Sequence, residues 1–221
     1  MFRFVLLSAF ALASAALGAA SPGFAARFGE LQKQLAAQPT NSALLFQLAD
    51  LCHDEGVNNN KDAVKLAEKY LRELLRLDSS NAPALALLGS TYTMKGRDAF
   101  WPGTQISLVK EGNKMMDEAA RLAPENFEVR IMRGLNNVRM PGFLKREEIA
   151  RADLAWLWAK LQAQPNDHPD DLRQRVAHWY GVALKKARQT AEARAVWQTG
   201  LAINPRSSPG REIQKQLDKL K

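Results

Sequence analysis

The sequence predicts an all-α protein, a right-handed α-solenoid of about four antiparallel helix pairs closed by a C-terminal capping helix. Three observations predict this class. Apolar residues recur at intervals of three and four residues, and no stretch alternates with the period of a strand. Glycines, aromatic residues and prolines recur in the same order along the chain. The last segment is polar with one apolar face, as the end of a solenoid requires.

The repeat pattern is clearest in residues 174–207. Small residues, Gly181 and Ala193, are expected where two antiparallel helices approach closely, because a larger side chain would not fit there. Trp197 is expected to fill the space beside them, and Pro205 is expected to end the second helix. These four residues therefore predict one complete helix pair.

A second repeat covers residues 82–126, but its two halves are separated by an insertion. Its first half holds Gly89 and Tyr92, and its helix is expected to end at Gly96. Its second half holds Ala119 and ends at Pro124. The insertion between the halves predicts an enlarged turn.

Two other segments match the repeat pattern less closely. Further pairs are expected at residues 41–81 and 127–173, preceded by a helix near residues 24–37. In the third pair, residues 141–144 predict another enlarged turn. Residues 208–221 predict the capping helix, which is rich in Lys, Gln and Asp.

These residues together resemble the tetratricopeptide (TPR) repeat family over about residues 41–207, and the middle block is similar to bacterial repeat proteins of unassigned function. The resemblance implies a TPR-like fold in which the first helix of each pair lines a concave groove that binds a protein or peptide. It places His53 and Ser90 on that groove. It also places acidic residues at one end and basic residues at the other, namely Asp50, Asp54, Arg139, Arg175, His178, Lys185 and Lys186.

One version of the family reads the carboxylate at a peptide C-terminus, and this chain departs from it. That version needs Lys and Asn on the first repeat's groove face, where Phe46 and Asp50 stand. A C-terminal peptide is therefore not expected as the ligand. An acidic segment with an apolar middle fits the expected charge pattern better.

The N-terminus predicts export. Arg3 precedes an apolar run over residues 4–17, and the small residues Gly18 and Ala20 fit the rule for a signal-peptidase site. The run is shorter than the roughly 20 residues that span a bilayer. We therefore expect residues 1–20 to be a cleaved signal peptide, residues 21–221 to form the repeat domain, and the mature protein to be periplasmic or secreted.

The net charge of +8 comes from the C-terminal quarter of the chain. Residues 172–221 hold eleven Lys or Arg against three Asp or Glu. Nucleic acid is not the expected partner of an exported protein, so an acidic protein face, a polyanion or anionic lipid headgroups are the candidates. A solvated helix end remains the alternative interpretation of Lys185, Lys186 and Arg188.

The sequence shows no motif for catalysis, a metal or a cofactor. Its three histidines and its single cysteine, Cys52, do not form a ligand cluster with metal-site spacing. No phosphate-binding loop or nucleophile elbow is present. We therefore expect a chain that is not an enzyme and binds neither a metal nor a cofactor.

The aromatic residues of the two expected turns, Phe100, Trp101 and Phe143, allow two interpretations. They could form a lip that contacts a partner, since Trp and Phe are common interface anchors. They could instead pack against each other in adjacent turns, and this burial is the favoured expectation.

Three functions follow in order of support. The first is a protein–protein interaction scaffold of the bacterial cell envelope. The second is an envelope protein that binds a polyanion or an anionic membrane surface through its basic C-terminal region. The third is a hydrolytic accessory enzyme, for which the sequence offers no residue.

Overall fold

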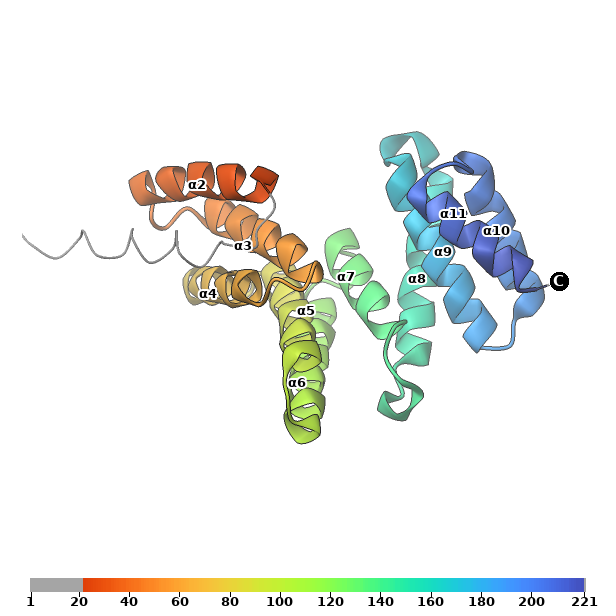
Figure 1. Ribbon diagram of the computed structural model, residues 1–221, viewed down its shortest axis with the longest axis horizontal. Helices are drawn as coiled ribbons and strands as arrows, with labels where there is room; N and C mark the ends of the chain where they lie inside the picture. The colour runs from red at the N-terminus through yellow and green to blue at the C-terminus, as the bar shows by residue number, and fades with distance from the viewer. Residues whose placement is uncertain (1–21, 221) are drawn as a thin grey trace, which may run out of the picture. The chain divides into compact units, whose positions relative to one another are not determined.

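The structure, a computed structural model, describes residues 22–220, and within them the chain is helical without a strand (Figure 1). The expected signal peptide and its cleavage site lie outside this part. Ten α-helices and two short 3-10 helices follow one another in the described residues. They are α2 (Pro22–Ala37), α3 (Ser42–Val57), α4 (Lys61–Leu77), α5 (Ala82–Asp98), α6 (Pro102–Leu122), α7 (Phe127–Asn137), η1 (Gly142–Leu144), α8 (Glu147–Ala163), η2 (Pro165–Asp167), α9 (Asp170–Lys186), α10 (Thr190–Ile203) and α11 (Ser208–Asp218).

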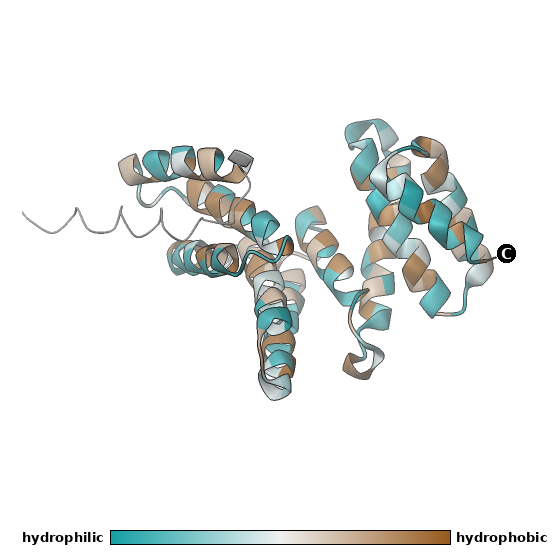
Figure 2. Cartoon of the chain, in the orientation of Figure 1, coloured by the Kyte–Doolittle hydropathy of each residue, from teal (hydrophilic) through white to brown (hydrophobic). Residues whose placement is uncertain are grey.

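The chain divides into two compact units, Met1–Leu122 and Ala123–Lys221. The described part of the first unit holds α2 to α6, and that of the second holds α7 to α11. In both units each helix packs against the next one in sequence. Figure 2 shows polar and apolar residues alternating along these helices, which is the pattern of helices that bury one stripe.

Asparagine side chains begin many of these helices. The side chains of Asn41, Asn60, Asn81 and Asn126 accept hydrogen bonds from backbone N–H groups in the first turns of α3, α4, α5 and α7. Ser207 does the same for α11. Each cap satisfies N–H groups that have no partner within the helix, which fixes where the helix starts.

In the first unit, α5 and α6 approach each other backbone to backbone. A Cβ added at Gly89 would lie 2.5 Å from the carbonyl oxygen of Gly112 and 2.8 Å from Cγ of Met116. A larger residue at Gly89 or Gly112 would clash with the other helix, so the close crossing of α5 and α6 requires glycine at both positions. Beside it, Tyr92 is 4% exposed and donates a hydrogen bond to Oε1 of Glu68 at 3.0 Å.

The structure corrects the expected enlarged turn in the second repeat. α5 runs past Gly96 to Asp98, α6 starts at Pro102, and only residues 99–101 join them. The inserted residues thus lengthen the two helices. Pro102 is compatible with this because proline is favoured in the first turn of a helix. Gly96 permits a close approach to α6, since its added Cβ would lie 2.8 Å from Val109.

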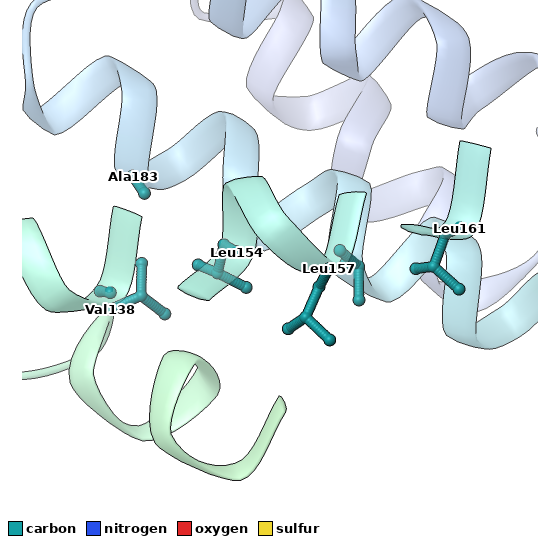
Figure 3. Close-up of a cluster of buried hydrophobic side chains, with 7 residues drawn as sticks. Val138, Leu154, Leu157, Leu161 and Ala183 are labelled. Carbon is teal, nitrogen blue, oxygen red and sulfur yellow. The ribbon is translucent and has the colours of Figure 1, made fainter. Parts of the chain in front are cut away.

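In the second unit, α8 lies between its neighbours. Leu154, Leu157 and Leu161 follow one side of α8 and belong to one buried cluster with Val138 and Ala183 (Figure 3). A second cluster around Trp197 joins α9, α10 and α11. The burial of these apolar side chains between neighbouring helices holds the stacked helix pairs together.

A buried carboxylate fastens α8 to α7. Asp153 is fully buried and accepts hydrogen bonds at 2.7 Å from both Arg130 and Arg133. Arg130 also donates to the carbonyl of Pro124 at 2.7 Å, which ties the start of this unit to the same group. The buried charge of Asp153 is thus fully paired within the fold, and these pairs hold α8 against α7.

None of the described helices combines the length and the apolar character that crossing a bilayer requires.

Candidate functional site: a cationic face on the second unit

The basic residues expected on the groove of the fourth repeat share one side of α9. Arg175, His178 and Lys185 follow one another at three- and seven-residue spacing, which returns to the same face of a helix. Trp179 and Lys186 flank them, each one position further on. Of these five, Arg175 and Lys186 are exposed and the others are partly exposed. We call Arg139, Arg175, His178, Trp179, Lys185 and Lys186 the cationic face.

Arg139 follows the end of α7 and lies on this face. Its guanidinium carbon is 4.5 Å from the centre of the Trp179 ring, which is a cation–π contact. Arg139 as a whole is exposed, but partial loss of water around its guanidinium, and secondly the positive charge of Arg175, lower its pKa. Two arginines therefore repel each other here, an arrangement that favours an anion.

His178 lies between this cluster and α11. Burial is the main cause that lowers its pKa, the positive charge of Arg139 lowers it further, and the carboxylate of Glu212 on α11 opposes both. Its ring packs against Trp179 with the ring centres 4.8 Å apart. Its Nε2 atom is buried and has no hydrogen-bond partner among the described residues.

The two lysines differ in what they contact. Lys186 donates a hydrogen bond at 2.6 Å to the carbonyl of Val138, which caps α7. Its charge therefore lies at the negative end of α7. Lys185 and Arg175 form no ion pair with any described residue, so their charges are available to a partner.

The expected acidic end of the groove lies in the first unit. Asp50 and Asp54 are exposed on α3. The neighbouring groove positions are not open, however. His53 is 7% exposed and Ser90 is 2% exposed, and their side chains lie 2.8 Å apart in a hydrogen bond between α3 and α5. The expectation that His53 and Ser90 face a groove is therefore wrong, because they fasten two helices together.

The His53–Ser90 pair has the residue types of a nucleophile and its base, but not their setting. A nucleophilic serine must reach its substrate, and Ser90 is almost wholly enclosed. The carboxylate of Asp54 lies 3.9 Å from Nδ1 of His53, beyond hydrogen-bonding range. The pair is thus explained by packing.

Three residues of the fourth repeat pattern, Gly181, Ala193 and Trp197, pack together between α9 and α10. A Cβ added at Gly181 would overlap the indole of Trp197, whose Nε1 donates to the carbonyl of His178 at 3.0 Å. Ala193 is fully buried beside them. Pro205 follows α10, and the adjoining carbonyl of Asn204 accepts a hydrogen bond from Gln174 at 2.9 Å.

The turn aromatics are exposed, so the expectation that they are buried is wrong. Phe100 is 83% exposed, Trp101 is 69% exposed and Phe143 is 67% exposed. The three-residue turn at 99–101 is too short to fold back over its own rings. Phe100 and Trp101 contact each other's ring edge to face, with centres 5.1 Å apart.

In residues 22–220, no three His, Cys, Asp or Glu side chains converge as metal ligands would. Cys52 is fully buried, and this burial, with the charge of Glu55 second, raises the pKa of its thiol to about 12. A thiol held protonated is a poor nucleophile and a poor ligand.

The comparison with solved structures identifies the architecture. The crystal structure of a thermophilic TPR protein in Thermus thermophilus superimposes with a TM-score of 0.65, covering 94% of this chain and 93% of that one, at 16% sequence identity. The fold is of the tetratricopeptide type. No protein-family model and no curated protein sequence matches the chain. At this identity the likeness extends to the fold alone, and the TPR-like fold is associated with protein partners in general.

Trp179 is the residue of the face that the sequence did not single out. The repeat pattern assigns no role to its position. A signal was nevertheless present, because Trp179 lies four residues after Arg175 and seven before Lys186. An aromatic ring at helical spacing between cations suggests a cation–π platform.

Proposed function

We propose that this chain is a protein-interaction scaffold of the bacterial cell envelope, and that it binds an acidic segment of its partner on the cationic face. The observation that carries the proposal is the placement of Arg139 on Trp179 beside Arg175. A carboxylate placed there would relieve the repulsion between two arginines and bond to a guanidinium already held by an aromatic ring.

The other parts of the proposal follow from the sequence and the fold. The signal-peptide pattern of residues 1–20 supports export to the periplasm or beyond. The TPR-like fold supports a protein or peptide ligand.

The test uses a fluorescent peptide rich in Glu and Asp and measures its affinity by anisotropy. The variant Arg175→Glu/Lys185→Glu reverses two charges on the face while leaving the Arg139–Trp179 contact and the Lys186 bond in place. The matched control, Lys215→Glu/Lys219→Glu, makes the same change in charge at exposed positions of α11 and its C-cap. Lys215 pairs there with Glu212, and such surface pairs contribute little to stability.

We expect the face variant to weaken binding by about tenfold or more and the control by about twofold, since charges at the contact act more strongly than the screened, exposed charges on α11. Equal losses in the two variants would show a diffuse electrostatic patch, which is the polyanion-binding alternative. Raising the salt concentration separates the same two cases, because diffuse binding falls steeply with screening.

A further inference from the structure

The turn between α5 and α6 carries the most exposed apolar surface in the described chain. Phe100 and Trp101 stand at this turn with most of their surface in water, and Ile106 in the second turn of α6 is 40% exposed. By contrast, Phe24, Phe28 and Trp197 are buried. Figure 1 shows that this turn joins α5 and α6, which pack against each other as a hairpin.

The tip of this hairpin is also free of charge. Residues 99–109 contain no Asp, Glu, Lys or Arg. The nearest charged side chain before them, Asp98, is neutralised by Arg97 at 2.7 Å. An uncharged tip can leave water without desolvating an ion, which is the main cost of entering an apolar medium.

The corresponding turn of the second unit has a similar composition. Pro141 and Gly142 lead into Phe143, which is 67% exposed, and Lys145 follows as an exposed cation. In the first unit Trp101 precedes Pro102 and Gly103. Two separate turns that join the helices of a pair thus each present an aromatic residue to the solvent.

From these observations we propose that the Phe100–Trp101 tip inserts into the interface of a lipid bilayer that contains anionic phospholipid. Trp and Phe are suited to this layer, where an apolar ring meets the headgroups. A bilayer offers the same chemistry at every point, so it can receive either tip, whereas a protein would need a matching pocket for each. The positive charge that attracts anionic headgroups lies in residues 172–221, so it adds to the attraction of the whole chain to the membrane and is not a property of the tip.

The test uses residues 21–221, because every described helix lies within this range and the apolar run at 4–17 would bind vesicles by itself. Vesicles are made of phosphatidylcholine with about one-fifth phosphatidylglycerol, an anionic content at which basic proteins bind measurably. Co-sedimentation gives the partition coefficient of the wild type and of two double variants. One is Phe100→Ser/Trp101→Ser, and its control is Val57→Ser/Leu77→Ser, which removes two other exposed apolar side chains.

We expect the tip variant to partition at least about tenfold more weakly, since two aromatic side chains lose their transfer into the interface. The control should partition as the wild type does. Both variants alter exposed residues, so circular dichroism melts should match the wild type. A wild type that does not bind these vesicles, or a tip variant that binds them equally well, overturns the proposal.

A spectroscopic arm locates the contact. Brominated lipids quench tryptophans that enter the bilayer, and Trp101 is the only exposed one among Trp101, Trp156, Trp158, Trp179 and Trp197. Trp101→Phe keeps an apolar ring, so it should bind within about threefold of the wild type and lose the quenched component. Unchanged quenching in that variant would place another surface at the membrane and overturn the proposal. Binding of the acidic peptide by the tip variant, measured separately, distinguishes this proposal from the scaffold proposal.

Discussion

Gly181→Ala tests the central packing contact of the second unit. A Cβ at this position would lie 2.6 Å from Cδ1 of Trp197 and closer still to two other atoms of its indole ring. The ring cannot easily move away, because Trp197 is fully buried and its Nε1 donates to the carbonyl of His178 at 3.0 Å. One added methyl group should therefore strain the core or displace the ring.

The magnitude follows from three contributions. Overpacking a buried site costs about 1–3 kcal/mol, and losing the indole hydrogen bond costs about 1 kcal/mol. Alanine is better than glycine inside a helix by about 1 kcal/mol, which offsets part of this. We expect the free energy of unfolding to fall by about 1–3 kcal/mol.

The measurement is urea unfolding followed by tryptophan fluorescence, because Trp156, Trp158, Trp179 and Trp197 all belong to the second unit. The matched control is Gly29→Ala in α2, where an added Cβ meets no atom within 4 Å. That variant, followed by circular dichroism, should be more stable by up to about 1 kcal/mol. A Gly181→Ala variant that is at least as stable as the wild type would contradict the close contact between Gly181 of α9 and Trp197 of α10.

Three further outcomes test other parts of the structure. Asp153→Ala should lower the free energy of unfolding by about 3–5 kcal/mol, because it removes the buried carboxylate that Arg130 and Arg133 share. By contrast, Glu118→Ala at the exposed Glu118–Arg121 pair should leave the melting curve unchanged. The folded pKa of His178 is lowered, so the unfolded chain binds its proton more readily, and stability should fall as the pH drops from near 7 through the unfolded pKa of about 6.5. Glu212→Gln should steepen that fall and His178→Asn should flatten it, as urea midpoints at several pH values would show. Cys52 should not react with a thiol reagent near pH 8 until the chain is unfolded, since burial raises its pKa to about 12; rapid native labelling would contradict its burial.

Much of the helical plan could be predicted from the sequence because the repeat residues act locally. The pair at 42–77 and the start of α7 at Phe127 match the expected positions, as does the helix from residue 208. Asparagine caps at 41, 60, 81 and 126 were a further signal for helix starts that the repeat pattern did not use. A cap and its first turn lie within four residues, so the sequence records them directly.

The inserted segment of the second repeat was harder because a composition suited to a turn also suits a helix start. Gly96 and Pro102 read as breakers in sequence. In the structure Gly96 gives α6 room to approach, and Pro102 occupies the first turn of α6. The choice between these roles depends on a partner helix that is distant in sequence, so local propensity could not make it.

For the cationic face, too, the sequence could not predict contacts between side chains of different helices. The repeat register placed Arg175, His178 and Lys185 on one side of α9, since that depends only on helical spacing. It could not show that Lys186 would bond to the end of α7, or that Arg139 would lie on Trp179. Those contacts depend on how α7 and α9 are packed in the second unit.

These two contacts also change how the cationic face should act. A row of four free cations would bind any polyanion, with strength set by charge alone. Here Lys186 is held by a carbonyl and Arg139 by an aromatic ring, so fewer side-chain rotations must be frozen when a ligand arrives. Arg175 and Lys185 supply the remaining attraction from the same side of α9. A fixed guanidinium on an indole favours a carboxylate that can approach in its plane, which is a more selective site than net charge would give.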